Sequence, residues 1–354
     1  MFPAEALAQE LKRRGRRVLL ATDARGARFA DGFPADARFE ISAATTSLGG
    51  PAAKARAAVA IARGLATAMM QFRRRKVDAA VGFGGYPSLP AMKAAAFMRV
   101  PYGIHEQNSV LGRSNRALAG DAAFVAHAFP TLTRAPKSIR RRLEVGNPVR
   151  DAVAALAGAP FENPAGGEIR ILVFGGSQGA SLFSKVAPAA IASLPKALRA
   201  RLNVVQQARD EDRDGVARVY AEAGVNVEIA PFFKDLPRRM ARAHLVIARS
   251  GASSVTELAT IGRPSILVPL GIAMDDHQTA NAKTLADAGA ATIVAEKDFN
   301  ADALGAALSR LLSDPASLAT MAARARGRVK ADAARALADL VDELLAQARG
   351  RRAA

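Results

Sequence analysis

The chain has 354 residues, of which 50% are hydrophobic, and it contains no cysteine and no tryptophan. This length suggests two domains of ordinary size, and the lack of cysteine excludes a disulfide scaffold and thiolate chemistry. The formal net charge of +18 predicts attraction to polyanions, anionic lipid head groups or phosphorylated substrates.

In the first part of the chain, short apolar runs alternate with helical patterns, which is typical of a parallel α/β domain. We expect helices over residues 4–14, 52–76, 91–98 and 113–119, and strands over residues 17–22, 39–41, 77–81, 100–104 and 123–126. A glycine-rich turn follows strand 77–81, and His105-Glu-Gln-Asn108 follows strand 100–104. Ligand groups in open α/β sheets lie at the carboxyl ends of strands, so Glu106 and Asn108 are candidate ligand residues. A polar loop without a ligand is the alternative.

The stretch 151–167 is rich in proline and glycine and predicts a linker between an N-terminal domain, 1–150, and a C-terminal domain, 168–330. The second domain repeats the alternation, with expected strands over residues 169–174, 203–206, 227–229, 245–248, 265–268 and 291–294. The pattern predicts two doubly wound, parallel sheets whose strand ends face each other across a cleft. The tail, residues 316–349, is expected to be helical, and the final helix, 331–354, is expected to pack back on the N-terminal domain.

Residues 171–180 read as strand, glycine loop and helix start, an arrangement that directs backbone N–H groups at an anion. Ser177 adds a hydroxyl donor at the start of the helix. The alternative is structural, because any turn between a strand and a helix can carry glycines. A second such element at Arg249-Ser-Gly-Ala252 favours the functional interpretation.

Glu257 lies about one turn into the helix after residue 252, where a carboxylate can accept both hydroxyls of a ribose. The alternative role is to complement the helix dipole. Gln278 and Asn281 share one face of the next helix, and neutral amides offer a donor and an acceptor to sugar hydroxyls. Asp275, Asp276 and His277 are adjacent in sequence and are interpreted as a loop and a helix cap, so we predict no metal site.

Six motifs together resemble the MurG family, the peptidoglycan N-acetylglucosaminyltransferases of GT-B fold. They are Gly82-Phe-Gly-Gly-Tyr86, His105-Glu-Gln-Asn108, Gly146-Asn-Pro-Val-Arg150, Gly175-Gly-Ser-Gln-Gly-Ala180, Arg249-Ser-Gly-Ala252 and Asp276-His-Gln-Thr-Ala-Asn281. Their order and spacing match over nearly the whole chain. The resemblance implies inverting transfer of GlcNAc from UDP-GlcNAc to lipid I, the undecaprenyl-diphospho-MurNAc-pentapeptide, which gives lipid II and UDP.

The resemblance also implies roles for single residues and a place in the cell. Asn108 and Arg150 would help to bind the donor, Ser177 would contact its diphosphate, Glu257 its ribose and Gln278 its GlcNAc, and the backbone near Phe233 would contact uracil. No cofactor or bound metal is implied. The expected location is the cytoplasmic face of the cell membrane, as a peripheral protein, with cell-wall synthesis and division proteins as further partners.

Helix 52–76 is the expected membrane contact, because a lipid-linked acceptor stays in the bilayer. Its apolar residues, interspersed with basic ones, suit an anionic leaflet, or they are core residues. These residues are Val59, Ile61, Leu65, Met69 and Phe72.

The start of the chain departs from the family pattern. The family opens with a strand and a Gly-Gly-Thr-Gly-Gly-His loop, whereas this chain begins at Met1-Phe2-Pro3-Ala4, where the following helix starts. We therefore expect a longer native protein, whose first strand lies between strands 18–21 and 79–81. The family's proposed catalytic histidine belongs to that loop, so the base stays unassigned, with Glu106 as a weak candidate.

Two further functions stay open. A shortened homologue that binds UDP-GlcNAc or a partner without turnover is one. A nucleic-acid or phospholipid binder is the other, and it is less favoured for nucleic acid because the chain has only three tyrosines to stack on bases and no RNP-type or zinc-finger signature.

Overall fold

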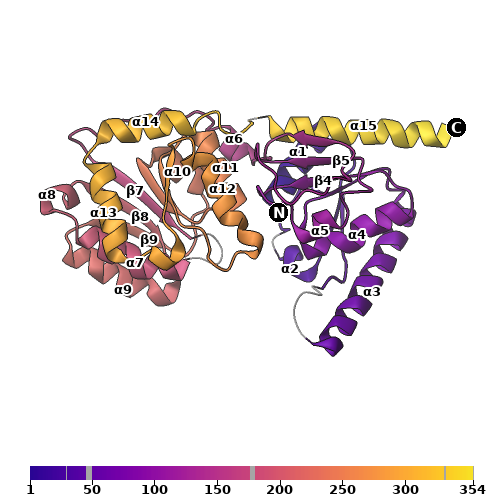
Figure 1. Ribbon diagram of the computed structural model, residues 1–354, viewed down its shortest axis with the longest axis horizontal. Helices are drawn as coiled ribbons and strands as arrows, with labels where there is room; N and C mark the ends of the chain where they lie inside the picture. Colours follow the sequence, from indigo (N-terminus) through magenta and orange to yellow (C-terminus); the bar gives the residue numbers. More distant parts are fainter. Residues whose placement is uncertain (29, 45–49, 176–179, 331, 354) are drawn as a thin grey trace. The chain divides into compact units, whose positions relative to one another are not determined.

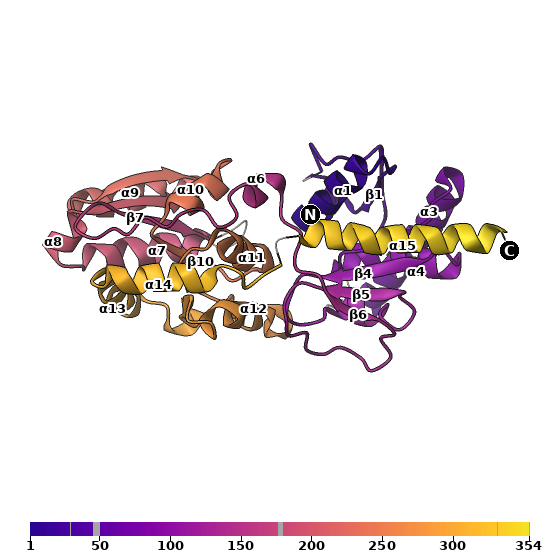
Figure 2. The same ribbon diagram turned by 90° about the horizontal axis from the view of Figure 1, so that it is seen from above.

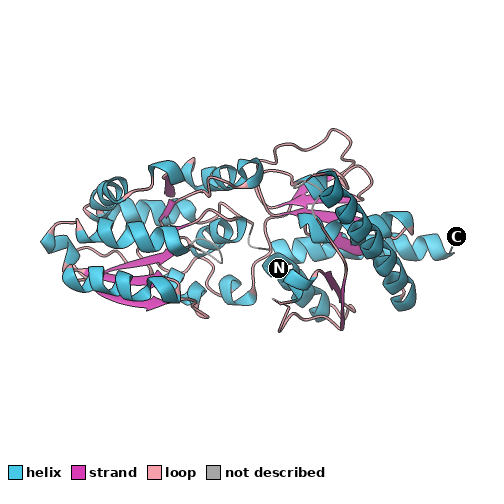
Figure 3. Ribbon diagram, turned by 90° about the horizontal axis from the view of Figure 1, so that it is seen from below, coloured by secondary structure: helices cyan, strands magenta, loops and turns pink. Residues whose placement is uncertain are grey.

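The computed structural model describes residues 1–28, 30–44, 50–175, 180–330 and 332–353 (Figure 1). It divides into two compact units, each with its own sheets and helices (Figure 3). Unit 1 comprises Met1–Arg150 and Asp332–Ala354, and unit 2 comprises Asp151–Ala331. None of the described helices is both long and apolar enough to cross a bilayer.

Unit 2 is built on one six-stranded sheet with the order β12-β11-β10-β7-β8-β9, in which every pair is parallel. Its strands are β7 (Ile169–Phe174), β8 (Leu202–Gln207), β9 (Asn226–Ala230), β10 (Leu245–Ala248), β11 (Ser265–Leu267) and β12 (Ala291–Ile293). The strand order reverses between β7 and β10, which is the topological switch point of a doubly wound sheet.

Helices cover both faces of this sheet. They are α6 (Asp151–Ala154), α7 (Ala180–Ala192), α8 (Lys196–Arg199), α9 (Asp210–Glu222), α10 (Leu236–Arg242), α11 (Ala252–Ile261), α12 (His277–Ala286), α13 (Ala301–Leu312) and α14 (Pro315–Ala325), with short 3-10 turns η1 (Met274–Asp276) and η2 (Glu296–Asp298). The buried core joins β7 and β8 to Phe183 of α7, Tyr220 of α9 and Leu308 of α13. Burial of these apolar side chains is the main force that holds the helices on the sheet.

Unit 1 contains two parallel sheets, β1-β2 and β3-β4-β5-β6. The strands are β1 (Leu19–Thr22), β2 (Ala37–Glu40), β3 (Ala80–Gly82), β4 (Tyr102–Glu106), β5 (Phe124–His127) and β6 (Arg142–Glu144). The helices are α1 (Phe2–Arg13), α2 (Ala24–Ala27), α3 (Pro51–Arg75), α4 (Gly85–Phe97), α5 (Arg113–Arg116) and α15 (Ala333–Ala353). Among the described residues, the second edges of β1 and β3 pair with no strand. The expectation of an additional first strand stays a prediction.

The final helix packs on the rest of unit 1. Helix α15 contacts α1 and β4, and Figure 2 shows it running beside them. Leu337 and Leu344 are buried against Leu7 of α1 and Phe124 of β5. Arg14 adds ion pairs to Asp339 and Asp342 at 2.7 and 2.9 Å.

Two local expectations were wrong, and one strand was not predicted. The tail is not one helix over 316–349, because the chain leaves the helical conformation at Arg326 (ψ 140°) and Gly327 takes a left-handed φ of 75°. Helix α4 begins at Gly85 instead of residue 91, because Pro87 falls in its first turn, where a missing N–H costs no bond. Strand β6, three residues long, has too little apolar pattern to be recognised.

Candidate functional site

The switch point of the unit 2 sheet brings the two glycine motifs of this unit together. Phe174 at the end of β7 pairs in register with Ala248 at the end of β10, so the loops that follow leave the same edge of the sheet. The N–H of Gly175 donates to Oε1 of Gln207 at 3.2 Å, which fixes the start of the first loop from β8. Ser177 lies outside the described residues, so its expected contact with a diphosphate stays a prediction.

Arg249 holds the loop that follows β11 in place. Its side chain is buried, and its guanidinium donates to the carbonyl oxygens of Val268 and Pro269 at 3.2 and 3.3 Å. It also forms a two-point ion pair with Glu296, at 3.2 Å from Nη1 and 3.1 Å from Nη2. Charge-assisted bonds of this kind restrict both partners to one geometry, so the loop after β11 is held against β10.

Gln278, on α12, also contacts the loop after β11. Its Oε1 accepts a hydrogen bond from the N–H of Leu270 at 3.0 Å, so its amide NH₂ is the end that remains for a sugar oxygen. Asn281, one turn further, is fully buried and donates from Nδ2 to the carbonyl oxygen of Ser250 at 3.3 Å. The two amides share a helix, as expected, but Asn281 joins α12 to the loop after β10.

Glu257 lies on α11, the helix that follows β10, and is 7% exposed. Helices α11 and α12 contact each other, so Glu257 and Gln278 belong to neighbouring helices that start at the same edge of the sheet. In the Pro231-Phe-Phe segment, Phe233 is buried beneath the Arg239 guanidinium, 4.4 Å from the ring centre, while Phe232 is 70% exposed. The expected contact of this backbone with uracil stays a prediction.

In unit 1, Glu106 is the centre of a hydrogen-bonded loop at the end of β4. It is 3% exposed, and its Oε1 accepts from the N–H and the Nδ2 of Asn108, each at 3.0 Å. Its Oε2 accepts from the N–H of Gly112 at 2.9 Å and from Nδ2 of Asn115 at 2.8 Å. Four N–H donors therefore occupy the carboxylate, which is the arrangement of a structural anchor.

The motif residues of unit 1 are joined to this anchor. Nε2 of His105 donates to the carbonyl oxygen of Gly146 at 2.8 Å, which ties β4 to the loop that ends in Arg150. Burial, opposed by the hydrogen bond to Gly146 and aided by the nearby His127, lowers the pKa of His105 to about 4, so its imidazole is neutral at pH 7. The guanidinium of Arg150 lies 4.0 Å above the ring of Phe2.

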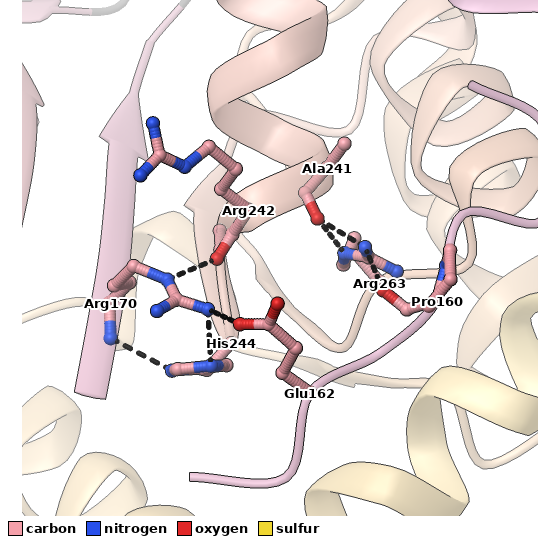
Figure 4. Close-up of a pocket in the computed structure, with 8 residues that line it drawn as sticks. Pro160, Glu162, Arg170, Ala241, Arg242, His244 and Arg263 are labelled. Atoms are coloured by element: carbon pink, nitrogen blue, oxygen red, sulfur yellow. Dashed lines mark hydrogen bonds and ion pairs between the residues drawn. The ribbon is translucent and has the colours of Figure 1, made fainter. Parts of the chain in front are cut away.

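A cavity of about 120 Å³ lies at the opposite edge of the unit 2 sheet, where β7 and β10 begin (Figure 4). Arg170 pairs there with Glu162 and donates from Nε to the carbonyl oxygen of Arg242 at 2.7 Å. Its N–H donates to Nδ1 of His244 at 3.0 Å, and burial, with the Arg170 charge, lowers the pKa of His244 to about 4.

Arg263, on the same cavity, has an unusual environment for a guanidinium. It is 1% exposed and donates to the carbonyl oxygens of Ala159, Pro160 and Ala241. Burial lowers its pKa to about 10. Because Arg263 donates to carbonyl oxygens of the linker, it holds the segment after α6 against the rest of unit 2. The cavity is separate from the motif loops.

Sequence reasoning missed the residues that act through others. Glu296, Gln207 and Asn115 carry no motif, although Glu296 and Gln207 lie at or just after the carboxyl ends of strands. The strand-end rule that selected Glu106 would also have selected them. Within the described part of the chain, no group of three His, Cys, Asp or Glu residues is placed to hold a metal ion.

Comparison with known proteins matches both halves of the chain. Residues 1–127 match the glycosyltransferase family 28 N-terminal domain, and residues 170–340 match the glycosyltransferase family 28 C-terminal domain. The chain is 49% identical over 353 residues to a UDP-N-acetylglucosamine--N-acetylmuramyl-(pentapeptide) pyrophosphoryl-undecaprenol N-acetylglucosamine transferase of Phenylobacterium zucineum, covering 99% of this chain and 96% of that protein.

Two further matches agree. A protein of the same name from Rhodospirillum centenum is 50% identical over 343 residues, covering 96% of this chain and 90% of that protein. Among solved structures, MurG of Acinetobacter baumannii superposes with a TM-score of 0.77 at 32% identity, covering 97% of this chain and 95% of that structure.

Proposed function

The chain belongs to the MurG family, the UDP-GlcNAc-dependent N-acetylglucosaminyltransferases of GT-B fold, and from that premise we propose its substrates and the roles of its residues. It transfers GlcNAc from UDP-GlcNAc to the undecaprenyl-linked MurNAc-pentapeptide, lipid I, and releases lipid II and UDP. In the inverting reaction, an acceptor hydroxyl attacks the anomeric carbon while the bond to the UDP oxygen breaks.

The observation that carries the donor site is the gathering of motif residues at the switch point of unit 2. The loops after β7, β10 and β11 leave one edge of the sheet, and Glu257 and Gln278 lie on helices that begin there. Ligands of open α/β sheets bind at this position. Glu257 then accepts the ribose hydroxyls, and the NH₂ of Gln278 donates to a GlcNAc oxygen. Ser177 and the backbone N–H groups before α7 receive the diphosphate, and they stabilise the charge that develops on the leaving UDP.

Unit 1 supplies the acceptor side in this proposal. From this unit, Asn108, on the loop anchored by Glu106, and Arg150, on the loop tied to β4 through His105, help to bind the donor. We assign Glu106 to positioning, because its oxygens already accept four N–H groups. The base that takes the acceptor proton is left unassigned.

Membrane contact is proposed for α3, since the acceptor is anchored in a bilayer. Met70 is 59% exposed on this helix, and a shallow groove there is lined by Met69, Met70, Arg73 and Arg74. Apolar and cationic side chains side by side suit an anionic leaflet. From the family resemblance, cell-wall synthesis and division proteins are proposed as further partners.

The proposal is tested by transfer of labelled GlcNAc from UDP-GlcNAc to a lipid I analogue, with UDP release followed in parallel. We expect Glu257→Ala to weaken donor binding by about 1–3 kcal/mol, the cost of leaving buried hydroxyl partners unpaired. Exposed Glu222→Ala, at the end of α9, is the control. Donor binding without transfer would indicate a binding protein instead of an enzyme, and unchanged donor binding in Glu257→Ala would refute the ribose contact.

A further inference from the structure

The loop between β11 and α12 is held by side chains from two other parts of unit 2. Arg249, at the end of β10, donates to the carbonyl oxygens of Val268 and Pro269. Glu296, after β12, accepts the N–H of Gly271 at 2.5 Å. Segment 268–271 is therefore anchored on both its carbonyl and its N–H groups.

The ion pair between Arg249 and Glu296 connects these anchors to each other. Arg249 is 8% exposed, and its two terminal nitrogens each contact a different oxygen of Glu296. The same Glu296 oxygen that contacts Nη1 also accepts from Gly271. Partial burial alone would raise the pKa of Glu296, but the Gly271 N–H and the Arg249 guanidinium together lower it, which keeps the carboxylate ionised at neutral pH.

The anchored segment 268–271 contacts Gln278 through a single backbone group. Leu270, one residue before Gly271, donates its N–H to Oε1 of Gln278 at 3.0 Å. That bond decides which end of the Gln278 amide is free, since an amide can turn over when its oxygen loses its donor. A shift of segment 268–271 would therefore change what Gln278 presents.

We propose that Glu296 is a positioning residue for the donor sugar: with Arg249 it holds Leu270 where Gln278 must present its NH₂ to GlcNAc. This rests on the proposed function, in which Gln278 contacts the sugar. In that function, uridine and diphosphate contacts come from Glu257 and the loop after β7, whereas Glu296 contacts Arg249 and Gly271 among the described residues. Glu296 should thus affect recognition of the sugar and not of the nucleotide.

The test compares Glu296→Ala and Glu296→Gln with the wild type, using KM for UDP-GlcNAc and, separately, the dissociation constant of UDP. Loss of one positioned hydrogen bond predicts a rise in KM of about tenfold for Glu296→Ala, with UDP affinity within about twofold. Glu296→Gln keeps an acceptor for Gly271, so its KM should lie between those of the wild type and Glu296→Ala. Asp298→Ala, exposed on the same 3-10 turn, is the matched control.

A double-mutant cycle checks the route through Gln278. In a Gln278→Ala background, Glu296→Ala should raise KM by no more than about twofold, because both variants remove the same contact. Hydrogen exchange of the peptide covering 268–278 should be faster in Glu296→Ala and unchanged in Asp298→Ala. The proposal is overturned if UDP and UDP-GlcNAc lose affinity equally, if the two variants add independently, or if exchange is unchanged.

Failure of the proposed function has a different signature. If Gln278→Ala alone leaves KM for UDP-GlcNAc unchanged, then Gln278 does not contact the sugar, whatever Glu296 does to the loop. Faster exchange in Glu296→Ala would then still establish its hold on segment 268–271, and the positioning role in sugar recognition would be refuted with its premise.

Discussion

Glu106 is a carboxylate whose surroundings define its role better than its position does. Both oxygens face N–H donors from Asn108, Gly112 and Asn115, and the side chain is 3% exposed. Close contact with Gly84 extends the network, because a Cβ on that glycine would lie 3.0 Å from Nδ2 of Asn115. A single anchor thus organises the loop after β4 and fits it against the glycine turn after β3.

We expect Glu106→Gln to destabilise unit 1 by about 1–3 kcal/mol, since its NH₂ would face donors and leave one of them unpaired. Urea unfolding measures the change, with Glu40→Gln, exposed at the end of β2, as the control. A variant of full stability that has lost only the acidic limb of its pH–rate profile would instead indicate a general base.

Two buried histidines predict acid sensitivity. Burial lowers the pKa of His105 and of His244 to about 4, from an ordinary value of 6.5. For His244, the charges of Arg170 and Arg263 contribute to this lowering of the pKa, and Glu162 and Glu168 oppose it. The unfolded chain then binds protons between pH 6.5 and 4 that the folded chain does not, so stability is complete above pH 6.5 and falls as the pH drops through this window.

The substitutions that remove this dependence keep the hydrogen bonds. His105→Gln retains a donor to Gly146, and His244→Asn retains an acceptor for the N–H of Arg170. Each should reduce the loss of unfolding free energy between pH 7.5 and pH 5, with about 1.4 kcal/mol for each pKa unit removed. Equal pH dependence in wild type and variants would contradict the assignment.

At the scale of single residues, the strand-end rule was the useful part of sequence reasoning. Glu257 and Gln278 were predicted from side-chain chemistry near helix starts, whereas the strand-end rule selected Glu106 and Asn108 and follows from backbone geometry alone. It could not find the pairing of Arg249 with Glu296, because 47 residues separate them and only the register of β10, β11 and β12 brings them together. It also could not assign roles, since a buried carboxylate and an exposed one look alike in a sequence.

At the scale of elements, the six strands of unit 2 were predicted because each is an apolar run bounded by turn residues. Elements with local exceptions were missed: a proline in the first turn of α4, a left-handed glycine after α14, and the short, partly exposed β6. Helix α3 shows how a pattern can serve two purposes. Phe72 is core and Leu65 and Met69 pack against it, while Val59 and Met70 are more than half exposed.

That exposed part of α3 leads to a prediction on membrane binding. Arg73→Glu with Arg74→Glu should weaken binding to vesicles that contain anionic lipid, because each cation near such a surface contributes about 1 kcal/mol. Vesicle sedimentation at low and high salt measures the effect, which should fade as salt screens the charges. Arg213→Glu with Arg218→Glu on α9 makes the same charge change in unit 2. If both variants lose binding equally, net charge explains it and α3 has no special role.

At the scale of the whole molecule, the buried cores follow the division into two units. Among the described residues, the cluster around β7 and β8 lies within unit 2, and three further clusters lie within Met1–Arg150 and α15. Unit 2 has one continuous six-stranded sheet, whereas unit 1 is divided into sheets of two and four strands. A two-stranded sheet is marginally stable by itself, so unit 1 should be the less stable of the two.

Calorimetry should therefore show two transitions, with unit 1 unfolding at the lower temperature. UDP-GlcNAc at a hundred times its dissociation constant stabilises the unit that binds it by about 2.7 kcal/mol, which raises the upper transition by roughly 5–10 °C and leaves the lower one nearly unchanged. Glu106→Gln should lower only the first transition, and Arg263→Lys, which loosens a buried guanidinium from linker carbonyls, only the second. A single transition that shifts as a whole when the donor is added would show that the two units do not unfold independently. A shift of the lower transition by the donor would show that the donor is not held mainly by unit 2.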